Sequence, residues 1–260
     1  MAGIVFGADP HLSRLTWADR PTIVGDAFYS LHQVIGFCLQ HGAELALLGD
    51  VFDSTRPDST AVAEACRAMD KMQEAQLRVF YIQGNHEKEA FTPWMSVHAW
   101  PQHIDKKTFR LDGVTYYGLD WRPSRSIKEE LQQVPPEATS LLLHQSMIEM
   151  MGTITQPECS GEDIPDHVDT IFVGDYHKHV AIPVQYQGRT PKMLYSPGPF
   201  NARNIRQIEP KGFWYRDQVG GISSIPLVTR GVVDRTVHRP EDLDEVMRHV
   251  QHYRTHLANT

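Results

Sequence analysis

The chain has 260 residues, of which 41% are hydrophobic and 22% charged, a composition typical of a globular protein with one large domain or one domain and a small appendage. It contains no apolar run long enough to span a bilayer, and its N-terminus lacks the basic start and cleavage site of a signal peptide, so we expect no membrane partner. The net charge of -7 argues against an indiscriminate nucleic-acid coat, but a local basic patch would still supply phosphate contacts.

The first half of the chain alternates short apolar strands with amphipathic helices. Pro21 opens the first predicted helix, Leu39 belongs to its apolar face, and Gly42 ends it. Asp58 or Ser59 is expected to cap the second helix. The predicted order is strand 4–6, helix 21–41, strand 45–48, helix 58–76 and strand 79–82. This alternation predicts a parallel sheet covered by helices.

The second half contains more strands. Asp112 and Gly113 form a hairpin signal between the predicted strands 108–111 and 114–119. Further apolar runs predict strands at 141–143, 170–173, 180–186, 192–195, 213–216 and 222–228, and the last four are expected to pair antiparallel. The whole pattern predicts an α/β fold in which two sheets pack face to face, with helices outside.

Polar side chains follow five of the predicted strands, at the point where each strand ends. In open α/β sheets, ligands bind beyond the carboxyl ends of the strands, so we expect these side chains to converge. The converging set is Asp9 and His11 after the first strand, Asp50 after the second, Asn85 after the third, His144 after strand 141–143, and Asp175 and His177 after strand 170–173.

These residues have the chemistry of a metal centre. Oxygen and nitrogen ligands without a thiolate favour manganese, iron or zinc over a structural zinc site. Seven ligands exceed what one such ion takes, so the set favours two ions, with Asp50 central enough to bridge them. Two ions about 3.5–4 Å apart clamp the oxygens of a phosphate during in-line attack. His144 in isolation would indicate a structural histidine, and only the other motifs reverse that interpretation.

The series of motifs resembles the calcineurin-like metallophosphoesterases, which carry DxH, GDxxD, GNH[DE], a lone His and GHxH in this order. The corresponding segments here are DPH at 9–11, GDVFD at 49–53, GNHE at 84–87, His144, and GDYH at 174–177. GDVFDSTRP, LLLHQ and YSPGPFNARN further resemble the SbcD-type DNA double-strand-break repair nucleases, and the resemblance covers about residues 3–235. It implies a two-sheet nuclease core at 1–230. It also implies a reduced, cap-like C-terminal segment at 231–260, where we predict one amphipathic helix at 240–257.

The resemblance implies a role for each motif residue. One metal would take Asp9, His11, Asp50 and His177, and the other would take Asp50, Asn85, His144 and Asp175. His86 would be the catalytic acid that protonates or stabilises the leaving oxygen. Asp53, counted with His86 among the catalytic residues, and Glu87 would orient the ligands and histidines. The implied cofactors are two divalent ions, Mn²⁺ first, with Mg²⁺, Fe²⁺ or Zn²⁺ as alternatives.

Position 175 departs from the family pattern, because Asp175 stands where the family has the first histidine of GHxH. Aspartate ligates the same ions, so we interpret the change as an exchange of ligands, the alternative being a carboxylate that caps the loop. The added negative charge favours harder ions such as Mn²⁺ or Mg²⁺. His179 is an extra histidine, expected as a packing residue near the rim of the site.

These patterns predict a two-metal-dependent DNA nuclease, an exonuclease or endonuclease that acts in DNA recombination, repair or degradation. Two alternatives stay open: a phosphodiesterase for cyclic nucleotides or nucleotide-lipid substrates, and a non-catalytic scaffold on the same fold. The expected partners are DNA, a second copy in a homodimer, and an ATPase of the SbcC type. The widely spaced Cys38, Cys66 and Cys159 indicate buried thiols, and hence a cytoplasmic protein, in the host cytoplasm if the source is viral.

Overall fold

A computed structural model of the chain describes residues 3–15, 25–87, 94–152, 156–202, 207, 209–229 and 247–248. The chain divides into two compact units. One comprises Met1–Asn201 and Glu209–Thr229, and the other comprises Ala202–Ile208 and Arg230–Thr260. The predicted helix at 240–257 lies outside the described residues, apart from Met247 and Arg248, which are helical and exposed. The predicted cap and its boundary therefore stay predictions.

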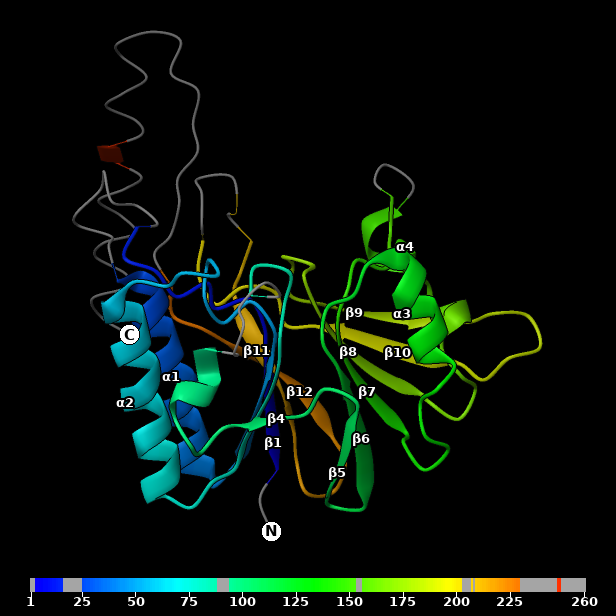
Figure 1. Ribbon diagram of the computed structural model, residues 1–260, viewed down its shortest axis with the longest axis horizontal. Coiled ribbons are helices and arrows are strands. Elements are labelled where there is room, and N and C mark those ends of the chain that lie inside the picture. Colours follow the sequence, from blue (N-terminus) through cyan, green and yellow to red (C-terminus); the bar gives the residue numbers. More distant parts are fainter. Residues whose placement is uncertain are drawn as a thin grey trace, which may run out of the picture. The chain divides into compact units, whose positions relative to one another are not determined.

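Two mixed sheets of six strands each build the first unit (Figure 1), which confirms the predicted α/β fold. The first sheet contains, in spatial order, β12 (Ile222–Pro226), β11 (Gly212–Arg216), β1 (Ile4–Gly7), β2 (Glu44–Leu48), β3 (Val79–Ile82) and β4 (Gln102–His103). The second contains β5 (Lys107–Leu111), β6 (Val114–Leu119), β7 (Ser140–His144), β8 (Thr170–Gly174), β10 (Lys192–Ser196) and β9 (Val180–Val184).

Each sheet contains four adjacent parallel strands, which reach one edge of the first sheet and lie in the middle of the second. In the first sheet β1, β2, β3 and β4 run parallel, and in the second β6, β7, β8 and β10 do so. The antiparallel pairing expected for the last four strands holds for β9 with β10 and for β11 with β12. It is wrong for the other edge of β10, which pairs parallel with β8. β11 pairs antiparallel with β1, so the chain returns to the first sheet.

Helices cover the outer face of each sheet (Figure 1). On the first sheet lie α1 (Asp26–His41), α2 (Ser59–Glu74) and the short 3₁₀ helix η1 (Trp94–Val97); near the second lie α3 (Ser124–Leu131), α4 (Ile148–Met151) and η3 (Gly161–Asp163). The carboxylate of Asp58 caps α2 by accepting hydrogen bonds from the backbone N–H groups of Thr60 and Ala61, both at 3.0 Å. The predicted inward position of Leu39 is wrong, because its side chain is 39% exposed.

Buried apolar side chains form three clusters, and alternate residues of the central strands belong to different clusters. Val5 and Leu45 pack against α1 and α2, while Phe6 and Ala46 point into the layer between the sheets. There the ring of Phe6 stacks on Phe172 of β8, with ring centroids 3.6 Å apart. A sheet that is covered on both faces needs apolar residues at every position, which is why these strands are continuous apolar runs in the sequence.

One smaller prediction is confirmed and another is confirmed only in part. Asp112 (φ 47°) and Gly113 (φ 81°) join β5 to β6 with both residues in the left-handed region, as a tight two-residue hairpin turn requires. The three cysteines are free; the predicted burial is confirmed for Cys38 and Cys159 and is wrong for Cys66, which is half-buried on α2. Within the part of the chain that the structure describes, no helix is long and apolar enough to cross a membrane.

Candidate metal centre

Every predicted site residue lies at the carboxyl end of a strand: His144 is the last residue of β7, and the others lie in the loops that follow β1, β2, β3 and β8. The first two of these loops are tied together through the backbone. Asp9 N–H donates to Gly49 O at 3.2 Å, and His11 N–H donates to Asp50 O at 2.9 Å. His144, at the end of β7 in the second sheet, contacts β2 in the first sheet, because its Nδ1 lies 2.7 Å from Leu48 O. These five strand ends therefore meet at one end of the two packed sheets, where the parallel strands have their carboxyl ends.

The backbone at this edge adopts an uncommon conformation. Four predicted ligands have positive φ: Asp9 at 51°, His11 at 45°, Asp50 at 48° and Asp175 at 72°. Non-glycine residues seldom occupy the left-handed region, and such strain is concentrated at functional sites. All four lie within four residues of the end of the preceding strand. The backbone therefore departs from the usual conformation at residues that are predicted to bind metal.

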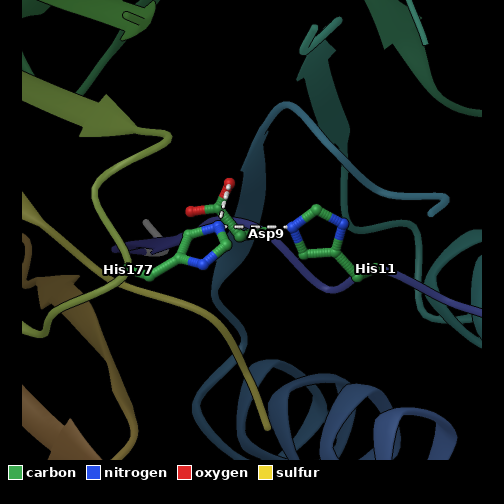
Figure 2. Close-up of side chains that lie close together, drawn as sticks. All are labelled: Asp9, His11 and His177. Atoms are coloured by element: carbon green, nitrogen blue, oxygen red, sulfur yellow. Dashed lines mark hydrogen bonds and ion pairs between the residues drawn. The ribbon is translucent and has the colours of Figure 1, made fainter. Parts of the chain in front are cut away.

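Asp9, His11 and His177 form the first cluster (Figure 2). Asp9 and His11 come from the loop after β1 and are buried, whereas His177 comes from the loop after β8 and is partly exposed. His177 Nε2 lies 3.4 Å from His11 Nε2 and 4.0 Å from Asp9 Oδ1. Their polar atoms face one another across a gap of the size that one cation needs.

Asp50 lies at the centre of the site. Its Oδ2 is 3.5 Å from His144 Nε2, 3.6 Å from His11 Nε2 and 3.8 Å from His86 Nε2. The three histidines come from the ends of three different strands, so one carboxylate oxygen is shared among them. Asp50 also joins Asp9 and His144 in a second group of potential ligands. This is the position that a carboxylate bridging two ions would occupy.

The hydrogen bonds of His144 orient its ring as a metal ligand. Leu48 O can only accept, so Nδ1 of His144 carries the proton and the lone pair of the neutral ring is on Nε2. That Nε2 faces Asn85 Oδ1 at 3.1 Å and Asp175 Oδ1 at 4.0 Å. Asn85 and Asp175, two other predicted ligands of the second ion, thus lie near His144 Nε2, whose lone pair points toward them.

The electrostatics of the site also suit cations. Burial raises the pKa of Asp9 to about 8; His144 opposes this shift, and the nearby Asp50 and Asp175 add to it. Burial likewise disfavours the charged form of Asp50, but His144, His11 and His86 outweigh it and lower its pKa. Asp9 Oδ2 is buried and accepts no hydrogen bond from the residues that the structure describes. Crowded, buried carboxylates with an unpartnered oxygen fit divalent ions, which would neutralise their charge.

Two further acidic residues hold the ligand loops in place. Asp53 Oδ1 lies 3.3 Å from His11 Nδ1, and the backbone oxygen of Asp53 accepts a hydrogen bond from His86 Nδ1 at 2.8 Å. Glu87 is buried and accepts hydrogen bonds from Phe52 N–H at 2.8 Å and Gly84 N–H at 3.3 Å, which joins the loops after β2 and β3. The orienting roles of Asp53 and Glu87 stay predictions, for which these contacts supply the geometry.

His179 takes no part in the cluster. Its Nδ1 lies 2.9 Å from Pro197 O, its Nε2 lies 2.6 Å from Ser224 Oγ, and its ring stacks on Trp214 with centroids 4.6 Å apart. It is a packing residue, as predicted.

Sequence reasoning missed Asp120, Trp121 and Glu158, which contact the segments next to two of the predicted ligands, through Gln83 and Ser146. The sequence carried a signal for one of the three. Asp120 is an acidic residue directly after a strand, much as Asp50 comes almost directly after β2.

The model of the calcineurin-like phosphoesterase family matches residues 3–179, and the chain belongs to this family. The family uses a dinuclear metal site, so the family assignment indicates a metal-dependent hydrolase, and the cluster around Asp50 is its candidate metal centre.

Similar proteins indicate which branch of the calcineurin-like phosphoesterase family the chain resembles. The chain is 28% identical over 188 residues to the DNA double-strand break repair protein Mre11 of Methanosarcina acetivorans, a match that covers 63% of this chain and 30% of that protein. It is 23% identical over 205 residues to Mre11 of Sulfurisphaera tokodaii, covering 72% and 52%. The uncharacterized metallophosphoesterase YhaO of Bacillus subtilis is 22% identical over 202 residues, covering 70% and 47%. The expected resemblance to repair nucleases is confirmed, while the chain spans about half or less of each relative's length.

A solved structure, TT1561 of Thermus thermophilus, has the same fold, with a TM-score of 0.53 over 86% of this chain and 98% of that one, at 12% identity.

Proposed function

We propose that the chain is a two-metal-dependent DNA nuclease, an exonuclease or endonuclease that acts in DNA recombination, repair or degradation. The observation that carries this proposal is the central carboxylate of Asp50, which lies within 3.5–3.8 Å of histidine nitrogens from the ends of three strands. Its position supports a site for a pair of ions. Similarity to Mre11 proteins supports DNA, among phosphodiesters, as the substrate.

Asp9, His11 and His177 would hold one ion, Asn85, His144 and Asp175 the other, and Asp50 both. When bound, the two ions supply Lewis-acid stabilisation of the negative charge on the reacting phosphate. Mn²⁺ is the proposed metal, because Asp175 contributes a hard anionic oxygen where the family pattern has an imidazole. Mg²⁺, Fe²⁺ and Zn²⁺ are the alternatives that a metal panel separates.

His86 is proposed as the acid for the leaving oxygen. Its side chain is 32% exposed, unlike the fully buried His11 and His144, so a substrate in solution has access to it. Asp53 O accepts from Nδ1, which leaves Nε2 directed toward the Asp50 side of the site. In the protonated ring Nε2–H is thus the group that donates to the departing 3′ or 5′ oxygen.

The test uses end-labelled single-stranded and duplex DNA with Mn²⁺, with Mg²⁺ or with a chelator. The wild-type protein is compared with His86→Ala and Asp175→His. We expect cleavage that depends on Mn²⁺ and falls by about 10²–10⁴-fold in His86→Ala. Asp175→His should retain cleavage, because histidine is the residue that the family pattern has there. The ladder of products separates exonuclease from endonuclease action.

Failure of the test has two distinct forms. No cleavage of DNA under any metal, with hydrolysis of a small phosphodiester such as bis-p-nitrophenyl phosphate, would replace the nuclease with a phosphodiesterase for small substrates. Inactivity toward both substrates would favour a non-catalytic scaffold. The homodimer and the SbcC-type ATPase stay proposals, and size-exclusion chromatography with light scattering tests the first of them.

A further inference from the structure

Three residues outside the family motifs connect two of the ligand loops. β6 ends at Leu119, and the next residues, Asp120 and Trp121, turn from the second sheet toward the first. Asp120 Oδ1 accepts from Gln83 N–H at 2.8 Å, and Trp121 N–H donates to Gln83 O at 2.8 Å. Both backbone groups of Gln83 are therefore hydrogen-bonded to consecutive residues that follow a strand of the other sheet. Gln83 directly precedes the Gly84–Glu87 loop, which carries Asn85 and His86.

The side chain of Trp121 reaches the loop after β7. Its Nε1–H donates to Glu158 Oε1 at 2.9 Å, and Glu158 Oε2 accepts from Ser146 N–H at 3.0 Å. Glu158 N–H also donates to Ser146 O at 2.9 Å, so the contact between these two residues is reciprocal. Ser146 lies two residues after His144. Through its backbone and its indole, Trp121 therefore contacts one ligand loop directly and the other through Glu158.

The two loops joined in this way meet at the second ion's ligands, where His144 Nε2 lies 3.1 Å from Asn85 Oδ1. These ligands come from different sheets, β3 in the first and β7 in the second, so no local backbone geometry fixes their separation. The first cluster contains no residue of either loop. A change in the spacing of the two loops would therefore alter one half of the centre and leave Asp9, His11 and His177 in place.

We propose that Trp121 and Glu158 are positioning residues that set the distance between Asn85 and His144, and thereby the affinity of the second metal position. This inference rests on the proposed two-metal function and assigns a role to residues that no motif contains. Partners that orient metal ligands change metal affinity by about 10- to 100-fold when they are removed. We expect Trp121→Phe, which keeps an aromatic ring and loses the N–H donor, to weaken the binding of one ion by such a factor.

The experiment measures metal binding and not cleavage. Metal-free wild-type protein and Trp121→Phe are titrated with Mn²⁺ by isothermal titration calorimetry, and electron paramagnetic resonance of the same samples distinguishes a spin-coupled Mn²⁺ pair from isolated ions. The matched control is Trp100→Phe, because the indole N–H of Trp100 is also half-buried and donates to a backbone oxygen, that of Leu77, at 2.7 Å. Glu158→Gln is the second variant, since it keeps the size of the side chain and removes one of its two carboxylate acceptors.

The wild type and Trp100→Phe are expected to bind two ions and to show the coupled signal. Trp121→Phe should bind one ion as the wild type does and the second about 10- to 100-fold more weakly, with isolated Mn²⁺ at two equivalents that becomes coupled again at high Mn²⁺. Glu158→Gln should weaken binding of the same ion by a smaller factor. If Trp121→Phe does not fold, the affinity measured for Glu158→Gln decides whether the inference holds. Two unchanged ions in both variants would overturn this inference alone. A wild type without a pair of ions would overturn the two-metal function as well.

Discussion

Replacing Gly84 with alanine tests whether the position of Asp50 controls the centre. A Cβ at Gly84 would lie 2.0 Å from Asp50 Oδ1 and 2.5 Å from Asp50 N, whereas ordinary contact begins at 3.4 Å. The carboxylate oxygen would have to retreat from 2.0 Å to 3.4 Å, a displacement of about 1.4 Å. The backbone nitrogen would have to move by about 0.9 Å for the same reason.

Such a shift separates Asp50 from the histidines that share its Oδ2. Because a misplacement of about 1 Å in a catalytic centre costs about 10²-fold in rate, we expect Gly84→Ala to lower Mn²⁺-dependent cleavage at least that much. Binding of both ions should weaken together, since Asp50 would bridge them. The assay pairs initial cleavage rates with Mn²⁺ titration calorimetry, and chemical denaturation should show a loss of about 1–3 kcal/mol from overpacking.

Gly36→Ala is the control. Gly36 lies on the exposed side of α1, and an added Cβ meets no atom of the described residues within 4 Å. Alanine is the better helix former, so this variant should gain about 0.5–1 kcal/mol of stability and keep both metal binding and rate. Wild-type rate and metal affinity in Gly84→Ala would refute the reasoning, because they would show that Asp50 need not occupy its observed position.

Three other predictions follow from the same structure. Chelation should abolish cleavage and lower the melting temperature, and Mn²⁺ at about 100 times its Kd should restore about 2.7 kcal/mol of stability; a melting temperature that is indifferent to Mn²⁺ would contradict a folded-state metal centre. Phe6→Ala should lower the free energy of unfolding in urea by about 3–5 kcal/mol, because Phe6 is fully buried between the sheets, whereas Tyr29→Ala, at a side chain that is 60% exposed, should change it by less than about 0.5 kcal/mol; equal losses would show that the layer between the sheets is not a stabilising core. His179→Ala should lower the melting temperature while leaving Mn²⁺ affinity unchanged, and a lost ion in calorimetry would return His179 to the site.

The convergence of the site residues could be predicted from the sequence because it depends on local signals. Each motif directly follows an apolar run, and parallel strands place their carboxyl ends at one edge, so Asp9 and Asp50 had to meet once the βαβ order was known. The hairpin at Asp112 and Gly113 was predictable for the same reason, since its turn chemistry involves two adjacent residues.

The remaining features depend on contacts between distant segments, and no periodicity encodes them. Strand β10 pairs parallel with β8 on one edge and antiparallel with β9 on the other, a choice that short apolar runs leave open. The Trp121–Glu158 contact joins positions 37 residues apart through a side-chain hydrogen bond. Asp53 directs its carboxylate to His11 and its backbone oxygen to His86, and the distribution of these two contacts is decided by the local packing of the loop.

The pairing of β1 with β11 has a consequence for the order in which the protein is synthesised. All the predicted metal ligands have been translated by residue 177, but one edge of β1 is covered only by β11, at Gly212–Arg216. At about 5–20 residues per second, a ribosome needs roughly 2–8 s to translate the intervening chain. During that interval the fully apolar β1 would present an open edge to other nascent chains, which makes the completion of β11 the step that ends its exposure to aggregation.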